Sequence, residues 1–227
     1  MIDKRRLLHE GAGQLGIALA EDDLDRLMVY CAELAKWSRR INLIARDTPE
    51  LQIIENHFLD SLTLLPLLRQ QEMGPVHLLD VGSGAGFPGL VLACVMAEAQ
   101  FTLVEPRQKR VTFLRHLVRT LGLTNVTVVA DRIEAHAAAW QGRFSHITSR
   151  AVAEPSVFLP LVRPLVTPEA KVILMLAREE ALAGVAQEGA DPWQIVETQV
   201  LQLPFSGAPR LLAVVSIADT SFWNNCF

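Results

Sequence analysis

The residues best suited to chemistry form a glycine-rich segment, LLDVGSGAGFPG, that spans residues 78–89. A short apolar run leads into it and a helical pattern follows it, so it is predicted to be a turn between a strand and a helix. Glycine adopts positive φ readily and lets a ligand approach the backbone without a Cβ in the way. Several classes of nucleotide-binding protein use such a turn, and individual residues decide between them.

Two of these classes are excluded by single positions. A P-loop places Lys and then Ser or Thr after its last glycine, but Leu90 and Val91 stand there. A nucleophile elbow places glycines two residues before and after its serine, but Ser83 has Val81 and Ala85 at those distances. Neither a phosphate clamp of the P-loop type nor a serine nucleophile is therefore expected.

Asp80 favours one of the two remaining ligands. A dinucleotide fingerprint needs a third glycine at position 87, where Phe stands, although Gly86 is adjacent. A carboxylate two residues before Gly82 would repel a pyrophosphate, whereas it suits the sulfonium and ammonium groups of S-adenosylmethionine. The aspartate and the three glycines, Asp80, Gly82, Gly84 and Gly86, therefore favour S-adenosylmethionine over NAD. An ordinary tight turn without a ligand is the structural alternative.

Three further positions are expected to contact an adenosine. Glu105 ends the next predicted strand, where an acid accepts hydrogen bonds from ribose hydroxyls in either cofactor. Ile133 and Glu134 follow the third predicted strand, where an apolar side chain and a carboxylate suit the ring and the amino group of adenine. For Asp131, just before them, helix capping is nearly as good an interpretation.

Residues 1–72 are predicted to be a helical extension. Leu24, Leu27, Cys31 and Leu34 recur at helical spacing and mark one apolar stripe. A second helix is expected to start with Thr48 as its cap and Pro49 in its first turn, and to run to about residue 70.

Residues 73–219 alternate between short apolar runs and helical stretches. The predicted strands are His77–Gly82, Gln100–Glu105, Asn125–Asp131, Phe144–Ala151, Ala170–Leu176, Gln194–Leu203 and Arg210–Ile217. The predicted helices are Gly89–Glu98, Gln108–Leu121, Ile133–Trp140 and Pro155–Val166. This rhythm indicates an α/β fold with a doubly wound, mostly parallel, seven-stranded sheet. The last two strands are close enough for an antiparallel hairpin, and residues 220–227 are read as a tail.

Composition limits the class of protein. The chain has 227 residues, of which half are hydrophobic and a fifth are charged, so one large folded unit with an extension is expected. No apolar stretch approaches the roughly 18 residues of a membrane span and no secretory signal is visible, so we expect a cytoplasmic protein. Cys31 and Cys94 read as core residues, and no metal site is predicted because the three cysteines are widely spaced.

The net charge of −4 means that nucleic acid would be bound only through local basic patches. Residues 106–130 contain no acid and carry five basic side chains: Arg107, Lys109, Arg110, Arg115 and Arg119. A second cluster comprises Lys36, Arg39, Arg40 and Arg46 with Trp37, an aromatic ring suited to stacking on a base. A third comprises Lys4, Arg5 and Arg6. Solvated helix faces are the alternative interpretation of each cluster.

Five motifs in order resemble one known family. They are KWxxRINL at residues 36–43, HFLDSL at 57–62, the glycine turn ending at Gly89, ExxxKRVxFL at 105–114, and TSRAVA at 148–153. Together they make the chain similar to the RsmG (GidB) family of bacterial 16S ribosomal RNA methyltransferases. Pro106 and the segment after Leu176 depart from the family pattern.

The resemblance implies a Rossmann-like class I methyltransferase fold and methylation by S-adenosylmethionine at N7 of a guanine (guanine 527) in the 530 loop of 16S rRNA. Its cofactor contacts fall on Gly82, Phe87, Ile133, Glu134 and Arg150, with Glu105 as the ribose acid. The implied partner is 16S rRNA or the 30S particle, and we expect a monomer. The basic residues expected at the RNA are Arg107, Lys109, Arg110, Arg39 and Arg40.

Guanine N7 carries a neutral lone pair, so its methylation needs alignment of donor and acceptor rather than a strong base. Arg150 ends the fourth predicted strand and is the residue expected to position cofactor or substrate in catalysis. A structural ion pair with Glu154 is the alternative for that arginine. His57 and His116 are expected to be structural, because neither has metal-ligand partners in the sequence.

Three other functions stay open at this point. The chain also fits a methyltransferase for a small molecule or a protein, which would make the basic clusters incidental. An NAD-binding oxidoreductase shares the glycine turn. A regulatory module that binds S-adenosylmethionine without turnover lies outside the enzymes.

Overall fold

The computed structural model describes residues 3–70, 74–150, 154–185 and 193–217. Its centre is one seven-stranded sheet in the order β3-β2-β1-β4-β5-β7-β6. The strands are β1 (His77–Val81), β2 (Gln100–Val104), β3 (Val126–Val129), β4 (His146–Ser149), β5 (Lys171–Leu176), β6 (Trp193–Gln202) and β7 (Pro209–Ile217). The first five are parallel, and β7 runs antiparallel to both β5 and β6. The predicted doubly wound, mostly parallel sheet and its final hairpin are confirmed.

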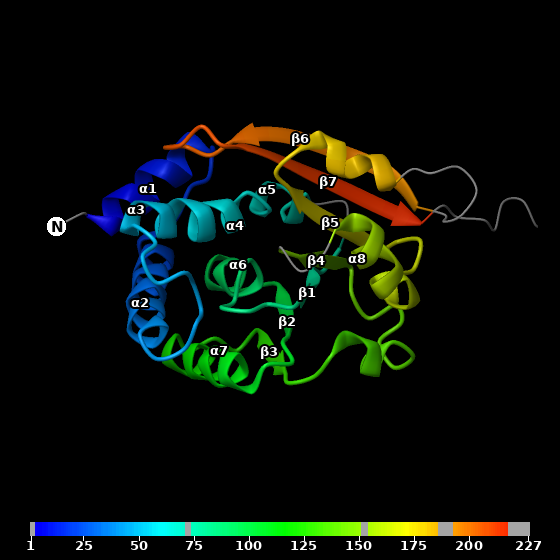
Figure 1. Cartoon of the computed structure of the whole chain (residues 1–227), viewed down its shortest axis with the longest axis horizontal. Coiled ribbons are helices and arrows are strands. Elements are labelled where there is room, and N and C mark those ends of the chain that lie inside the picture. The colour runs from blue at the N-terminus through cyan, green and yellow to red at the C-terminus, as the bar shows by residue number, and fades with distance from the viewer. Residues whose placement is uncertain (1–2, 71–73, 151–153, 186–192, 218–227) are drawn as a thin grey trace, which may run out of the picture.

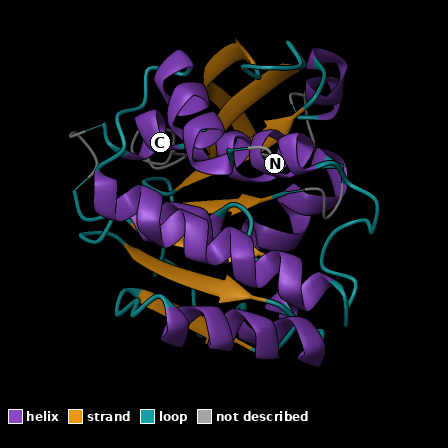
Figure 2. Cartoon of the chain, turned by 90° about the vertical axis from the view of Figure 1, so that its left-hand side faces the viewer, coloured by secondary structure: helices purple, strands orange, loops and turns teal. Residues whose placement is uncertain are grey.

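Helices cover both faces of the sheet. On one face lie α6 (Gly89–Val95) and α7 (Gln108–Thr120), with α2 (Glu21–Ser38) packed outside them, and on the other lies α8 (Pro155–Val162) (Figure 1). Figure 2 views the molecule from the side of the first group, whose helices lie in front of the strands. Neighbouring residues of β1 serve different layers, because Leu78 belongs to the first core and Leu79 to the second.

The N-terminal part packs against the first of these layers. It comprises α1 (Lys4–Gln14), α2, α3 (Glu50–Ile53), a π-helix η1 (Ile54–Leu59), α4 (Asp60–Leu62) and α5 (Leu65–Leu68). Asp3 caps α1 by accepting a hydrogen bond from the backbone N–H of Arg6. Leu24, Leu27, Cys31 and Leu34 of α2 are buried, as their spacing predicts, and Cys94 of α6 is buried too.

The second N-terminal helix differs from the prediction in two ways. Its cap is Pro49 rather than Thr48, whose hydroxyl instead donates to the carbonyl of Ala45. The run is also not one regular helix, because η1 inserts a π-helical turn between α3 and α4 and the helix is interrupted before α5. A π-helical turn changes which side chains face the sheet, and such turns are frequent at functional sites.

The segment after β3 was predicted as a helix to Trp140, but only a short 3-10 turn, η3 (Ile133–His136), forms there. Two further 3-10 turns follow α8 and β5, namely η4 (Arg163–Leu165) and η5 (Glu179–Gly184). None of the helices in the described ranges is long and apolar enough to cross a membrane. Cys226 and the tail at 220–227 lie outside the described residues.

Candidate functional site

A hollow of about 470 Å³ opens where the carboxyl ends of β1, β2 and β4 meet. Ligands of open parallel sheets bind at this edge. Its lining residues come from the N-terminal part, the glycine turn, the end of β2, the start of α7 and the end of β4. They are Leu43, Ile44, His57, Gly82, Ser83, Gly84, Ala85, Phe87, Glu105, Pro106, Arg107, Arg110 and Arg150. We call this hollow the glycine-turn pocket.

The glycine turn needs its glycines for different reasons. Gly82 and Gly84 have φ of 70° and 60°, a conformation that glycine adopts without strain, and both line the pocket. Gly86, with φ of 98°, lies behind them, where a Cβ would come within 2.5 Å of the Tyr30 hydroxyl. The turn is fixed to β2, since the N–H groups of Gly82 and Ser83 donate to the carbonyl of Val104. The first two glycines therefore give a ligand access to the backbone, and the third allows close packing.

Asp80 lies beneath this turn. Its side chain is fully buried, and its Oδ2 accepts a hydrogen bond from the N–H of Gly89 at 3.0 Å. Burial raises the pKa of Asp80 to about 7, although the Gly89 hydrogen bond opposes the shift. Oδ1 has no hydrogen-bond partner among the described residues. Asp80 is not a lining residue of the pocket, so its expected contact with a cofactor cation stays a prediction.

Glu105 is held in one orientation at the pocket wall. Its Oε2 accepts from the N–H of Gly84 at 3.0 Å and its Oε1 accepts from the N–H of Arg107 at 2.8 Å. The guanidinium of Arg110 lies 3.6 Å from Oε2. A carboxylate oxygen has more than one lone-pair site, so each oxygen can accept a further hydrogen bond from a ligand. This is the arrangement expected of an acid that binds two ribose hydroxyls.

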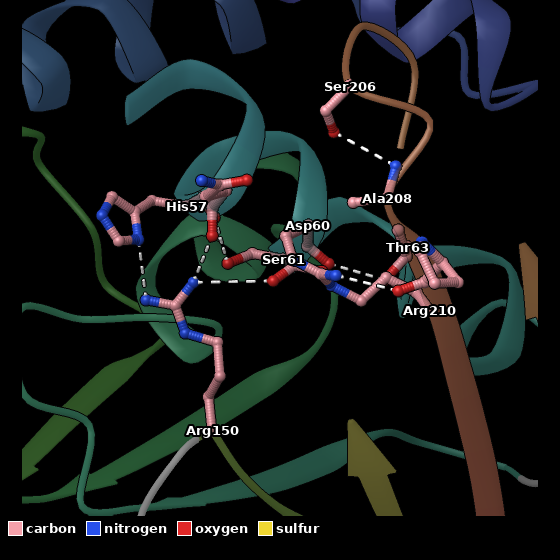
Figure 3. Close-up of polar contacts among 10 residues, drawn as sticks. His57, Asp60, Ser61, Thr63, Arg150, Ser206, Ala208 and Arg210 are labelled. Atoms are coloured by element: carbon pink, nitrogen blue, oxygen red, sulfur yellow. Dashed lines mark hydrogen bonds and ion pairs between the residues drawn. The ribbon is translucent and has the colours of Figure 1, made fainter. Parts of the chain in front are cut away.

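Arg150, His57 and Phe87 form another part of the pocket wall. Figure 3 shows the guanidinium of Arg150 directed at the His57 ring. The guanidinium of Arg150 donates to the carbonyl of Asn56 at 2.7 Å and to Nδ1 of His57 at 3.0 Å. Its Cζ lies 4.9 Å from the centroid of the Phe87 ring, a cation–π distance. The His57 ring is nearly parallel to the same ring, with centroids 4.9 Å apart. The pocket thus joins an arginine, a histidine and an aromatic ring.

Asp60 is the ion-pair partner of Arg150, at 3.8 Å, and Glu154 is not. The same carboxylate accepts from Nε of Arg210 at 2.8 Å, so it lies between two guanidinium groups (Figure 3). Burial raises the pKa of Asp60, while the two arginines act in the opposite direction. The alternative of an ion pair with Glu154 is therefore wrong as to the partner, and the positioning role of Arg150, which lines the pocket, stays a prediction.

Two predicted adenine contacts lie apart from these residues. Ile133 is buried in the second core layer, and Glu134 is exposed on the following 3-10 turn. Neither is a lining residue of the glycine-turn pocket, so their contacts with adenine stay predictions.

The basic residues fall into three groups. Arg107 and Arg110 line the pocket, and Lys109 is exposed beside them on the first turn of α7. Arg39 and Arg40 are exposed after the end of α2, where Arg39 lines a separate hollow.

The third cluster is largely neutralised by acids. Lys4 pairs with Glu50, Arg6 lies 3.8 Å from Glu10, and Arg5 pairs with two carboxylates, those of Glu21 and Asp25. Of the second cluster, Trp37 packs on Phe113 and His116 and donates to Glu33, so its ring is already in use. Besides Arg150, the basic side chains that line the pocket are Arg107, the N-cap residue of α7, and Arg110 of α7.

His57, Asp60 and the pair Leu43 and Ile44 were not predicted as site residues. The sequence does contain a signal for two of them, because His57 and Asp60 lie three residues apart in a predicted helix and so are expected to share a face. His57 was expected to be structural. The structure shows that it also lines the pocket. Among the described residues, no group of three or more His, Cys, Asp or Glu side chains is arranged to hold a metal ion.

The fold is found in other proteins. A mutant of MtNAS, solved in complex with S-adenosylmethionine, superposes with a TM-score of 0.56 at 15% identity, over 95% of this chain and 88% of that one. Precorrin-6y C5,15-methyltransferase from Geobacter metallireducens superposes with a TM-score of 0.51 at 13% identity, over 70% of this chain and 87% of that one. At this level of identity the likeness concerns the fold, which is that of the class I methyltransferases.

Sequence comparison is more specific. Ribosomal RNA small subunit methyltransferase G of Desulfotalea psychrophila is 41% identical over 212 residues, which cover 92% of this chain and 96% of that protein. The model of the family GidB, described as rRNA small subunit methyltransferase G, matches residues 23–212. This range includes the glycine turn, Glu105, Arg150 and the helix that carries His57 and Asp60. The chain therefore belongs to the family of rRNA small subunit methyltransferase G.

Proposed function

We propose that the chain methylates N7 of a guanine in 16S ribosomal RNA, in the 530 loop, with S-adenosylmethionine bound in the glycine-turn pocket. A member of this family is a methyltransferase of small-subunit rRNA. The observation that carries the assignment of the site is the fixed Glu105 carboxylate beside two positive-φ glycines at the carboxyl edge of the sheet. Family membership sets aside the NAD-dependent, small-molecule and purely regulatory alternatives.

The residues present fit this cofactor. Glu105 would hold the ribose hydroxyls. Its two carboxylate oxygens are fixed by the backbone N–H groups of Gly84 and Arg107, and each oxygen can still accept a hydrogen bond from a hydroxyl. The open backbone at Gly82 and Gly84 would face the rest of the nucleoside. When bound, S-adenosylmethionine supplies an electrophilic methyl group on a sulfonium.

The chain itself has to orient a guanine so that its N7 faces the methyl group. Glu105 is the only acid among the described residues that line the pocket, and its oxygens are bound by backbone N–H groups and Arg110. No strong base is needed, because N7 of neutral guanine already carries a free lone pair. The rate enhancement then comes from alignment of the reacting atoms rather than from proton transfer.

The rRNA is proposed to approach along the start of α7. Arg107 and Arg110 lie at the pocket, and Lys109 is exposed next to them, so a phosphate near the target base would meet positive charge. Arg39 and Arg40 are proposed as a second contact farther away. The 30S particle or its precursor is the proposed substrate, the chain acting as a monomer in the cytoplasm.

The division into residues 1–72 and 73–219 is proposed as a structural description only. Both parts contribute to the pocket, because Leu43, Ile44 and His57 come from the first.

The test is a map of N7-methylguanine in 16S rRNA from cells with and without the gene. We expect the modification in the 530 loop to be missing without the protein and restored when purified protein and S-adenosylmethionine are added to the 30S particles. In parallel, calorimetry should show binding of S-adenosylmethionine and none of NADH. A methyl group at another nucleotide, or an unchanged map, would refute the proposal.

A further inference from the structure

His57 has one ring nitrogen committed and one available. Nδ1 accepts a hydrogen bond from Arg150, whose guanidinium has donors only. In the neutral ring the proton must therefore lie on Nε2, and the hydrogen bond found for the His57 ring among the described side chains is the one at Nδ1. Figure 3 shows the Nδ1 edge directed at Arg150 and the other nitrogen directed away from the residues drawn.

The ring stays neutral at physiological pH. Burial first, and the neighbouring Arg150 charge second, lower the pKa of His57 to about 4. A charged histidine would carry N–H donors on both ring nitrogens and could not accept the hydrogen bond from Arg150, so the neutral ring is the form that fits this contact. The His57 ring thus offers the pocket an uncharged donor with a fixed direction.

The ring is also held in place. It lies nearly parallel to Phe87, with an interplanar angle of 16°, and Phe87 in turn stacks on Tyr30 and meets Phe58 edge-on. The backbone carbonyl of His57 accepts from the Ser61 hydroxyl within the same helical segment. A donor held on several sides is suited to recognition, because little entropy is lost when it binds.

We propose that His57 Nε2–H donates a hydrogen bond to O6 of the target guanine and thereby selects guanine over adenine. This inference rests on the proposed function. On the Hoogsteen edge, O6 of guanine is an acceptor next to N7, whereas adenine presents an amino donor at the same place. With an adenine, the Nε2–H of His57 would face the amino group of the base, and neither donor would have an acceptor in this partly buried pocket. With a guanine, the Nε2–H donates to O6, so both groups are hydrogen-bonded.

The available alternatives fit this role less well. Arg150 already donates to Asn56 and His57, and Arg110 lies 3.6 Å from the Glu105 carboxylate. His57 is the uncharged donor in this set, and it leaves the N7 lone pair free for the methyl group. It is a specificity residue that touches the substrate and takes no part in bond making.

The test uses 30S particles reconstituted with 16S rRNA that is ligated to carry guanine, inosine or 2-aminopurine at the target position. Inosine keeps O6 and N7, whereas 2-aminopurine keeps N7 and lacks O6. Transfer of a labelled methyl group from S-adenosylmethionine gives kcat/KM for each base. The wild type should prefer guanine and inosine over 2-aminopurine about tenfold or more, the loss expected for one hydrogen bond.

In His57→Phe, which keeps an aromatic ring against Phe87, the preference should fall to about one because the guanine rate drops and the 2-aminopurine rate does not. His57→Gln, which offers both an acceptor for Arg150 and an N–H donor, should restore part of the preference. Calorimetry with S-adenosylmethionine and a urea titration check that each variant is folded. A wild-type preference near one, or a preference unchanged in His57→Phe, would overturn the inference. Failure of the wild type on guanine would instead refute the proposed function.

Discussion

Asp60 and Arg210 are joined by a hydrogen bond of 2.8 Å although 150 residues separate them in the sequence. The bond links the helical segment that carries His57 to β7, at the far end of the chain. The same carboxylate lies 3.8 Å from Arg150 (Figure 3). A second link runs beside it, because Glu55 accepts from the N–H groups of Phe205 and Ser206 in the hairpin turn. The hairpin thus supports the pocket wall without lining it.

Replacement of Arg210 by methionine should destabilise the protein. Asp60 is buried, and a buried charge that loses its partner costs about 3 to 5 kcal/mol in the free energy of unfolding. Urea titration measures the loss. The double variant Asp60→Asn with Arg210→Met should recover part of it, because no uncompensated carboxylate then remains. Equal stability of the single variant and the wild type would show that the ion pair contributes nothing.

Replacement of Glu105 by glutamine should weaken binding of S-adenosylmethionine by roughly one to two powers of ten. Hydrogen bonds to a charged group contribute about 1.5 to 3 kcal/mol, and the amide cannot accept at both of its terminal atoms. Calorimetry gives the affinity, and Glu98→Gln, an exposed position after α6, is the control. An unchanged affinity for Glu105→Gln would remove this residue from the site.

Replacement of Gly84 by aspartate should abolish binding of S-adenosylmethionine and leave the fold intact. Aspartate tolerates positive φ better than most residues, and the space around a Cβ at this position is ordinary. Its carboxylate would, however, enter the pocket next to Glu105. Gly122→Asp is the matched control, since Gly122 also has positive φ and nothing within 4 Å of a Cβ. If the Gly84 variant binds normally, the pocket is not the cofactor site.

Most of the fold and half of the site could be predicted because they depend on local patterns. Continuous apolar runs define parallel strands, and a glycine turn between strand and helix places Gly82 and Glu105 at one edge. The partner of Arg150 could not be predicted in this way, since Asp60 meets it through tertiary packing of a distant helix. The π-helical turn at η1 was missed for a related reason, because periodicity alone does not reveal an extra residue per turn.

The place of Asp80 shows a different limit. Charge reasoning places the carboxylate beside a cofactor cation, which stays a prediction, and the structure adds that its Oδ2 accepts from the N–H of Gly89. A position two residues before a glycine does not tell which side of the strand its side chain faces, and here it faces α6.

Replacement of Lys109 by glutamate should lower kcat/KM on 30S particles and spare the affinity for S-adenosylmethionine. The Lys109 side chain is exposed and does not line the pocket. Its neighbour Arg110 lies close to Glu105, so a change at Arg110 would alter cofactor binding as well as RNA binding. The loss should shrink as the salt concentration rises, because phosphate contacts are screened. Arg6→Glu, in the cluster that pairs with acids, provides a comparison. Identical rates for Lys109→Glu and wild type at low salt would favour a merely solvated helix face.

Asp80 should make stability depend on pH. Burial raises the pKa of Asp80 to about 7 in the folded protein, against an ordinary value of 3.8. Between these two values the folded state keeps a proton that the unfolded state releases, so this group's contribution to stability falls as the pH rises from about 4 to about 7. Asp80→Asn should remove this dependence.

The measurement is the difference in free energy of unfolding between Asp80→Asn and the wild type at several pH values. The free energy of unfolding of the variant relative to that of the wild type should rise up to about pH 7 and then level off. The difference is needed because burial lowers the pKa of His57 and of His146 to about 4, and these two groups make the wild type lose stability as the pH falls. A difference that is flat across this range would show that Asp80 is ionised throughout.

The part of the chain before β1 contributes a wall of the pocket as well as a cover for the sheet. Leu43, Ile44 and His57 line it, and Asp60 pairs with Arg150, which contacts His57. A shortened protein that begins at β1 would keep the glycine turn and Glu105 while losing the surface where a base is recognised. Such a fragment would also lose Tyr30 and Phe58, which pack on Phe87, and the hydrogen bond from the Tyr30 hydroxyl to the carbonyl of Ala85, so both sides of the pocket depend on one shared core.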